Sequence, residues 1–255
     1  MDQLNNYCLD RWLQPTNLPT LQRNRIHVWR AKLDVPDPEI DRLASVLSVD
    51  EVARANRFRF AQHRRRFIVA RGILRQLLGN YLDIEPKDIQ FYYGDRGKPY
   101  LKEKDKLIPL QFNLSHSQEY ALYGFTYYYP IGVDLEYLRE MSDIIKIARR
   151  FFSNREYELL MKATEEARAK LFFQLWTAKE AYLKAIGTGI GDSLADVDLA
   201  IDEVLSPRLL AIKGDRVAAA KWSLRSCVPA TGYIASVAIK NTFMIPVDFW
   251  HWHQN

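Results

Sequence analysis

Residues 176–184, WTAKEAYLK, place one glutamate and two lysines inside an otherwise apolar run. On a helix, Glu180 and Lys184 are four positions apart and therefore lie on one face, with Trp176 one turn earlier. The commoner meaning of such a pair is an ion pair on the helix surface. The chemical meaning is a carboxylate that binds a metal ion or accepts a proton, beside an ammonium group that neutralises an anion. The segment alone leaves both meanings open.

Two further carboxylates lie upstream in IGVDLEYL, residues 131–138. Because side chains alternate along a strand, Asp134 and Glu136 would share one face, opposite the apolar residues between and beside them. Strands often carry such acids simply on a solvent-facing side. If a third carboxylate lies nearby, however, three such oxygen ligands completed by phosphate and water suit Mg²⁺, which seldom takes an all-protein cage.

The tripeptide SHS at residues 115–117 raises the question of nucleophilic catalysis. Ser115 and His116 alternate across a strand, so they cannot readily form the hydrogen bond of a Ser-His pair, and the chain has no GxSxG elbow. The pattern therefore disfavours a hydrolase triad. A structural role is the default for His116, and donation to a phosphate is the functional alternative.

The chain is densely basic between residues 54 and 75. The arginine run at 64–66 is typical of a solvated helix face, but with Lys98 in GDRGKPY it could hold a phosphorylated nucleotide. The neighbouring aromatic residues also fit RNA binding, although no RRM, KH or helix-turn-helix signature is present. A nucleic-acid-binding module is thus the non-enzyme alternative. Another Mg²⁺-dependent phosphotransferase or nuclease is the enzyme alternative, without a P-loop or kinase signature to support it.

Composition sets the outer limits. The 255 residues are 48% hydrophobic and 26% charged, with a formal net charge of +5, which is typical of an ordinary soluble protein. Two distant cysteines without a CxxC spacing indicate neither a disulfide framework nor a zinc site. No apolar run is long enough to span a membrane and the N-terminus does not resemble a signal peptide, so we expect a cytoplasmic protein without a membrane partner.

Hydrophobic periodicity predicts two long helices, one within 63–82 and one at 171–186. Gly79, at the end of the stretch 66–79, and Gly187 are the expected end signals. Each follows a shorter helix capped by serine and precedes strands, and the C-terminal HWH is expected to be a tail. This weak internal repeat predicts an α+β protein of two similar, pseudo-symmetric halves in one chain, each with a long helix packed on a small, mostly antiparallel sheet. The halves would be residues 1–127 and 128–255, with a ligand between them.

Five segments in order, GDRGKPY, FNLSHS, IGVDLE, RFFSNREYELL and LWTAKEAYLKAIGTGI, resemble the Sfp-type 4'-phosphopantetheinyl transferases of the holo-carrier-protein synthase superfamily. The resemblance covers about residues 54–191. It implies transfer of the phosphopantetheine group from coenzyme A to a serine of an apo acyl or peptidyl carrier protein, with release of adenosine 3',5'-bisphosphate. Two halves in one chain look like the Sfp type, and imply a monomer with no nucleic-acid partner.

The resemblance also implies roles for individual residues. Mg²⁺ would be held by Asp134, Glu136 and Glu180, and Glu180 would take the proton of the carrier serine, directly or through a water. Lys184 would assist the leaving group. The coenzyme A phosphates and nucleotide would be contacted by Arg59, Arg66, Lys98, Ser115, His116, Lys179 and Lys184. The N-terminal half would then bind the nucleotide, and the C-terminal half would carry Mg²⁺ and the catalytic residues.

The same resemblance suggests where the carrier protein docks. Carrier proteins of this class are typically acidic, so a mildly basic enzyme would attract them. We expect docking in the cleft beside Glu180, near Phe151, Phe152 and the strand at 113–117. The sequence does not distinguish a carrier of fatty-acid, polyketide or peptide synthesis.

Overall fold

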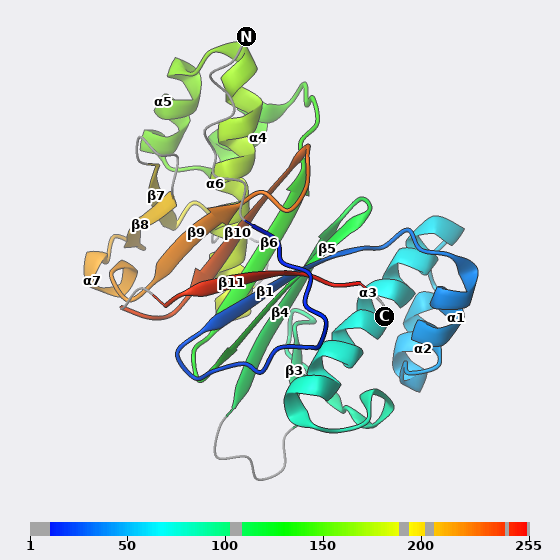
Figure 1. Cartoon of the computed structure of the whole chain (residues 1–255). Helices are drawn as coiled ribbons and strands as arrows, with labels where there is room; N and C mark the ends of the chain where they lie inside the picture. The colour runs from blue at the N-terminus through cyan, green and yellow to red at the C-terminus, as the bar shows by residue number, and fades with distance from the viewer. Residues whose placement is uncertain (1–10, 103–108, 189–193, 202–206, 243–244, 254–255) are drawn as a thin grey trace.

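Two sheets lie back to back at the centre of the molecule, and a long helix covers the outer face of each (Figure 1). The computed structural model describes residues 11–102, 109–188, 194–201, 207–242 and 245–253. Apolar side chains on the facing sides of the two sheets, Val28 and Leu122 from one and Val133 and Val237 from the other, form a shared core. The layers therefore run helix, sheet, sheet, helix, as expected for an α+β protein.

The N-terminal half is built on a four-stranded sheet in the order β11-β1-β5-β4. Its strands are β1 (Ile26–Lys32), β4 (Leu110–Ser117), β5 (Tyr120–Tyr127) and β11 (Val247–His251). Helix α3 (Ala61–Leu82) packs on the outer face through a core that includes Trp29 and Phe125. The remaining elements of this half are α1 (Asp37–Ala44), α2 (Val49–Ala55), the short 3-10 helix at Pro86–Asp88, and the hairpin of β2 (Phe91–Tyr93) and β3 (Pro99–Leu101).

The C-terminal half is built on a three-stranded antiparallel sheet in the order β6-β10-β9. Its strands are β6 (Ile131–Tyr137), β9 (Ser223–Cys227) and β10 (Tyr233–Ile239). Helix α6 (Glu165–Ile186) covers the outer face. The other elements are α4 (Ile144–Phe151), α5 (Asn154–Lys162), α7 (Arg216–Ala219), and the hairpin of β7 (Val197–Ile201) and β8 (Pro207–Ile212). The predicted fold class, with one long helix on a small sheet in each half, is confirmed.

The last strand departs from the predicted division at residue 127. β11 pairs in parallel with β1 and so belongs to the N-terminal sheet, although it lies at the end of the chain. The Arg25 guanidinium donates to both carboxylate oxygens of Asp248 at 2.6 and 2.9 Å, which fixes the pairing. The expected C-terminal tail is therefore wrong as far as His251, because the edge of β1 offers unpaired backbone groups to this segment.

The two long helices also end differently from one another. α6 ends at Gly187, which takes a left-handed φ of 77°, as predicted. α3 continues past Gly79 to Leu82, and Asp83 takes the left-handed position with a φ of 55°. Gly79 serves a different need, because a Cβ there would lie 2.8 Å from the carbonyl oxygen of Ile84. No helix in the described parts of the chain is long and apolar enough to cross a membrane.

Candidate active site

The close approach of α6 to β6 builds the site. A Cβ on Gly132 would fall 2.0 Å from the carbonyl oxygen of Ala181 and 2.4 Å from the amide nitrogen of Ala185, so only glycine permits this contact. Alternation along β6 puts Asp134 on the same face as Gly132, the face that α6 covers. The helix turn that lies on Gly132 is therefore the one that carries the sequence-predicted acid and lysine.

Three side chains from three elements meet at Asp134. Its Oδ1 accepts a hydrogen bond from Ser115 Oγ of β4 at 3.0 Å. The same oxygen forms an ion pair with Lys184 Nζ of α6 at 2.5 Å. The Lys184 ammonium also donates to Ser115 Oγ at 2.9 Å. Because β4 belongs to the N-terminal half and β6 and α6 to the C-terminal half, the cluster lies where the halves join.

Two carboxylate oxygens in this cluster have no hydrogen-bond partner among the residues that the structure describes. Asp134 Oδ2 and Glu180 Oε1 are buried without a hydrogen bond, and the two residues are only 4% and 2% exposed. Burial, followed by the charge of Asp134, raises the pKa of Glu180 to about 7. A buried acceptor without a donor costs about 1–3 kcal/mol, and a bound cation could offset that cost here. Glu180 is therefore not half of a surface ion pair, and Lys184 pairs with Asp134 instead.

Glu136 stands apart from these two carboxylates. It is half-buried, and its Oε2 accepts from Ser117 Oγ at 3.2 Å and from Arg139 at 3.3 Å. Burial and the charge of Asp134 raise its pKa, so the acids sense one another. Within the described ranges no three His, Cys, Asp or Glu side chains form a ready-made metal cage. The donor set fits Mg²⁺ only as an open site, completed by oxygens that the protein does not supply.

The seam between β4 and β6 is made by side chains. Asn113 Oδ1 accepts from the Val133 amide at 2.8 Å, and Ser117 Oγ accepts from the Tyr137 amide at 3.1 Å. With Ser115 they form one polar row in NLSHS that bonds to β6 in place of a backbone ladder. The sequence prediction did not assign Asn113 and Ser117 to the site, and the alternation of polar residues along NLSHS is the signal that could have found them.

The structure does not support the expected phosphate contact of Lys179. Its ammonium is fully buried, pairs with Glu156 at 2.6 Å and donates to the carbonyl oxygen of Leu194 at 2.9 Å. Five positions separate it from Lys184, which turns the two side chains about 140° apart around the helix. The two lysines of WTAKEAYLK therefore point to different parts of the protein, and Lys179 packs inside the C-terminal half.

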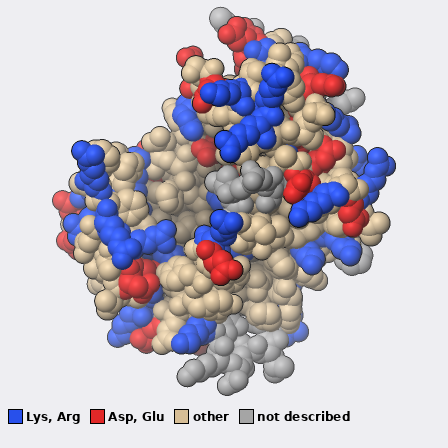
Figure 2. Space-filling model, turned by 180° about the vertical axis from the view of Figure 1, so that it is seen from behind, with Lys and Arg blue, Asp and Glu red and all other residues tan. Residues whose placement is uncertain are grey.

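Positive groups gather around His116 at the exposed end of the seam. Partial desolvation lowers the pKa of His116, and the charges of Lys184, Arg54 and Arg66 lower it further. Arg66 is already engaged, because its guanidinium forks onto the Asp34 carboxylate at 2.7 and 2.8 Å. Lys and Arg side chains stand on the lobe of α1 to α3 and on the α4–α5 lobe, on either side of a hollowed surface (Figure 2). This concentration of charge suits an anionic ligand.

A groove of about 540 Å³ opens beside these groups on the N-terminal half. It is lined by Asp50, Arg54, Arg57, Phe58, Tyr93 and Gly97. Arg59, a predicted ligand residue, places its guanidinium 5.6 Å from the ring centroid of the exposed Phe60 and is not among the lining residues. The sequence prediction had noted the basic stretch without assigning Arg54 and Arg57 to the site.

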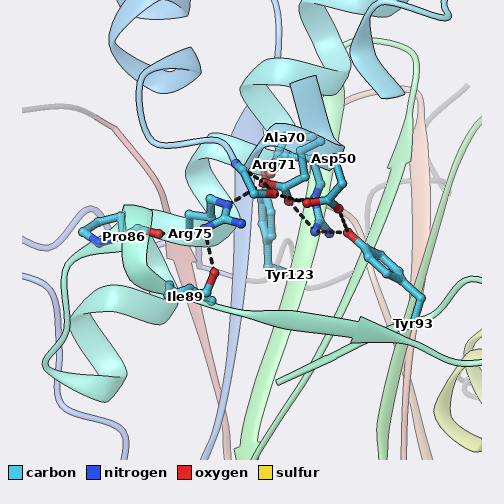
Figure 3. A network of polar contacts seen from close by, with 10 residues as sticks. Asp50, Ala70, Arg71, Arg75, Pro86, Ile89, Tyr93 and Tyr123 are labelled. Atoms are coloured by element: carbon cyan, nitrogen blue, oxygen red, sulfur yellow. Dashed lines mark hydrogen bonds and ion pairs between the residues drawn. The ribbon is translucent and has the colours of Figure 1, made fainter. Parts of the chain in front are cut away.

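A buried network behind this groove fixes the position of α2 (Figure 3). The Glu51 carboxylate accepts from Arg71 at 2.6 Å and from Arg75 at 2.5 Å, both on α3. Arg75 also donates to the carbonyl oxygens of Pro86 and Ile89 at 2.9 and 3.0 Å. Two of the arginines in the basic stretch, Arg71 and Arg75, are thus structural, and they anchor α2 where Arg54 meets the groove.

Tyr93 connects that network to the groove wall. Its hydroxyl accepts from Arg71 Nη2 at 3.2 Å and donates to Asp50 Oδ2 at 3.4 Å. Lys98, a predicted phosphate contact in the same hairpin, instead donates to the carbonyl oxygens of Lys184 and Ala185 at 2.6 and 2.9 Å. The hairpin therefore touches both the groove and the end of the helix that carries Lys184.

Comparison with known families covers most of the chain. Residues 130–238 match a model described as the 4'-phosphopantetheinyl transferase superfamily, and residues 33–124 match one described as 4'-phosphopantetheinyl transferase, N-terminal. A solved structure of a holo-(acyl-carrier-protein) synthase from Bacillus anthracis in complex with CoA (3',5'-ADP) aligns with 22% identity and a TM-score of 0.36, over 43% of this chain and 93% of that one.

Curated relatives match between 60% and 94% of the chain. The 4'-phosphopantetheinyl transferase HetI of Nostoc is 46% identical over 94% of this chain and 98% of its own length. The 4'-phosphopantetheinyl transferase Sfp of Bacillus subtilis is 29% identical over 60% of this chain and 65% of its own. The resemblance inferred from the five sequence segments is confirmed, and the chain belongs to the 4'-phosphopantetheinyl transferase family, in its Sfp type.

Proposed function

We propose that this protein transfers the 4'-phosphopantetheine group from coenzyme A to a serine hydroxyl of an apo acyl or peptidyl carrier protein, in a Mg²⁺-dependent reaction of the holo-[acyl-carrier-protein] synthase type. The serine oxygen forms a bond to the phosphorus, the phosphoanhydride bond breaks, and adenosine 3',5'-bisphosphate leaves. The observation that carries the proposal is the buried pair of carboxylates, Asp134 and Glu180, each with an unpartnered oxygen, beside the ammonium group of Lys184.

Mg²⁺ would be held by Asp134 and Glu180, with Glu136 joining them if its bond to Arg139 opens. When bound, the ion would neutralise charge that develops on the pyrophosphate as the phosphoanhydride breaks. The pairing of Lys184 with Asp134 supports a cationic role for Lys184 at the same phosphates. These residues supply the opposite charges that a pyrophosphate and its metal ion require.

Glu180 is the proposed general base. In the metal-free protein, burial and the charge of Asp134 raise its pKa to about 7. Mg²⁺ at this carboxylate would lower the pKa, so the group would be free of its proton when the ion is bound. It would take the proton of the carrier serine directly or through a water. Lys184 would then stabilise the departing bisphosphate oxygen.

The nucleotide end of coenzyme A would lie in the groove of the N-terminal half. Arg54 and Arg57 line it, and His116 and Ser115 lie at the seam between this groove and the carboxylates. Arginine forks are suited to phosphate groups, and Phe58 offers an apolar wall to the base. Arg59 and Arg66 stay proposed as peripheral contacts, Arg66 only in exchange for Asp34.

The carrier protein would approach along the rim formed by α4 and β4. Arg149 and Arg150 are exposed at the end of α4, and the Arg150 guanidinium lies 4.9 Å from the ring centroid of Phe151. Phe152, which we expected on this rim, is buried against Phe172 and is not available for docking. With a net charge of +5 the protein would attract an acidic carrier, and since both halves lie in one chain we propose that it acts as a monomer.

The test is intact-protein mass spectrometry of a purified apo acyl carrier protein after incubation with this protein, coenzyme A and Mg²⁺. We expect the carrier to gain one phosphopantetheinyl group, and to gain none without the metal ion or with Glu180→Gln. Glu158→Gln, an exposed acid on α5, is the matched control and should keep full transfer. No gain with several carriers, together with no rise in melting temperature on adding coenzyme A, would show that the proposal is wrong.

A further inference from the structure

The β2–β3 hairpin of the N-terminal half contacts the C-terminal end of α6, the helix that carries Glu180 and Lys184. β2 and β3 are joined by a turn in which the Gly97 amide donates to the Gly94 carbonyl at 2.8 Å, and Gly97 has a φ of 78°. The next residue, Lys98, extends from this turn to the last turn of α6. The only sequence signal for this contact is GDRGKPY itself, which reads as a turn and does not say what the turn touches.

The last turn of α6 needs such a partner. The final four carbonyl groups of a helix have no donor within the helix. Here the amides of Gly187 and Thr188 both return to the Leu183 carbonyl, at 2.8 and 3.2 Å, which leaves the carbonyls of Lys184 and Ala185 to Lys98. A cation at this end also lies at the negative pole of the helix dipole.

The fit around Lys98 is close. A Cβ at position 187 would fall 2.6 Å from the Tyr100 hydroxyl, so Gly187 allows the hairpin to approach as well as the helix to end. The Lys98 ammonium lies 5.3 Å from the ring centroid of Tyr100, which in turn stacks on Tyr92. Burial lowers the pKa of Lys98 to about 8. Two backbone carbonyls and one aromatic ring thus hold this ammonium group.

The hairpin also forms part of the proposed coenzyme A groove. Tyr93 and Gly97 line it together with Arg54 and Arg57. One rigid turn therefore contacts the groove on one side and, through Lys98, the backbone of Lys184 on the other. The Lys184 side chain is the one that pairs with Asp134 and Ser115.

We propose that Lys98 is a positioning residue, which clamps the last turn of α6 so that Lys184 stays against Asp134 and which links the coenzyme A groove to the catalytic helix. This rests on the proposed function, and it replaces the direct phosphate contact expected from the sequence resemblance. A direct contact would serve binding of coenzyme A. A clamp serves the rate of the chemical step, because a displaced catalytic group loses rate without losing affinity.

The clamp itself is tested without any substrate, by amide hydrogen exchange of the unliganded protein. Lys98→Met should speed exchange of the amides in residues 184–188 by about tenfold or more, since a hydrogen bond to a charged group contributes about 1.5–3 kcal/mol. Lys98→Arg should restore slow exchange in part. Arg96→Met, an exposed change in the same turn, is the matched control and should leave exchange as in the wild type.

Steady-state kinetics then test the link to the reaction. Lys98→Met should lower kcat by about 10- to 100-fold with the KM for coenzyme A within about twofold of the wild type, and Lys98→Arg should recover part of kcat. If Lys98→Met does not fold, Lys98→Gln keeps an uncharged amide donor on a side chain one atom shorter and carries the same test, with a smaller change expected.

Two outcomes would overturn the proposal. Unchanged exchange together with a KM for coenzyme A raised tenfold or more would make Lys98 a direct ligand. Faster exchange with an unchanged kcat would make the clamp a stability feature only. Failure of the proposed function is distinct from both, because a wild-type protein that modifies no carrier would still show the exchange difference if the clamp exists.

Discussion

The molecule buries charge in two places and treats it in opposite ways. Behind α2, the Glu51 carboxylate is enclosed by two guanidinium groups, and Arg75 has its remaining donors on backbone carbonyls. Where α6 rests on β6, Asp134 and Glu180 each keep a buried oxygen without a partner among the described residues. The first arrangement is complete within the chain, and under the proposed function the second is completed by a ligand that supplies positive charge.

This difference distinguishes charged residues that stabilise the fold from charged residues that are proposed to bind a ligand. A satisfied buried network gives little net stability, but removing one member leaves an uncompensated ion and is strongly destabilising. An unsatisfied carboxylate pair already costs stability, so neutralising one acid there relieves repulsion. Substitutions at the two places should therefore have opposite effects on folding and on activity.

The largest effect is expected at the carboxylate site. Asp134→Asn should lower the transfer rate by about 10²- to 10⁴-fold, because a bound metal ion contributes several kcal/mol of charge stabilisation and its ligand set would lose a charge. The free energy of unfolding should stay within about 1 kcal/mol of the wild type, because the relief of repulsion with Glu180 offsets the loss of the ion pair with Lys184, whose side chain is 29% exposed. Carrier modification by mass spectrometry and urea unfolding measure the two quantities. A variant that loses both activity and several kcal/mol of stability would contradict the distinction.

The converse experiment is Glu51→Gln in the buried network. It should lower the free energy of unfolding by about 3–5 kcal/mol, because Arg71 and Arg75 are then buried without an anion. The folded fraction should still modify the carrier protein. Its KM for coenzyme A should rise only if α2, which carries Arg54, moves relative to the groove. Asp41→Asn, on an exposed position of α1, serves as the control and should unfold like the wild type. Normal stability of Glu51→Gln would mean that the network is not the anchor of α2.

The sequence could reveal one of these places better than the other. Alternation in β6 put Asp134 and Glu136 on one face, and helical spacing put Glu180 beside Lys184, so each half of the carboxylate site was visible within a few residues. What joins them is Gly132, whose missing side chain lets α6 rest on β6. The presence of a glycine inside a strand does not predict which helix will pack on it.

Contacts between segments that are distant in the sequence could not be predicted either, because local sequence does not identify the partner. β11 pairs with β1 across more than two hundred residues, and nothing local in VDFWH distinguishes a strand from a tail. Glu51 of α2 meets Arg71 and Arg75 of α3, which are 20 and 24 positions away along the chain. The capping box of Ser153 and Glu156, in contrast, lies within one helical turn, so both partners can be recognised from adjacent sequence. Local chemistry was predictable, and the choice of partners was not.

A third buried group, His27, sharpens the comparison, because burial favours its neutral form although Asp248 lies 3.8 Å away. His27 of β1 is 2% exposed, its Nδ1 lies 2.8 Å from the Tyr81 hydroxyl, and burial lowers its pKa from 6.5 to about 4. Since the unfolded chain binds the proton more readily, His27 contributes stability above pH 6.5 and loses it as the pH falls towards 4. The loss should reach at most about 3 kcal/mol.

The measurement is urea unfolding of the wild type and His27→Asn at several pH values between 7 and 4. Asparagine keeps an acceptor near the position of Nδ1 but does not titrate. The difference in unfolding free energy between the two proteins should therefore shrink or change sign as the pH falls. A difference that is independent of pH would mean that His27 is protonated in the folded protein as readily as in the unfolded chain.

The smallest effect on the reaction is expected at Lys179, and it tests whether two lysines of one helix can be assigned by burial alone. The double variant Lys179→Met with Glu156→Gln removes both charges of an enclosed pair, so its stability should fall by less than the 3–5 kcal/mol expected when one partner is lost. Its kcat and its KM for coenzyme A should stay within about threefold of the wild type, whereas Lys184→Met should lose about 10²-fold or more in kcat. The double variant leaves the net charge of the protein unchanged, so a change in its KM for coenzyme A would report the loss of the Lys179 ammonium group and not a general effect of charge. A KM for coenzyme A raised tenfold in the double variant would mean that Lys179 contacts the coenzyme A phosphates. Burial would then not distinguish the structural lysine of α6 from the functional one.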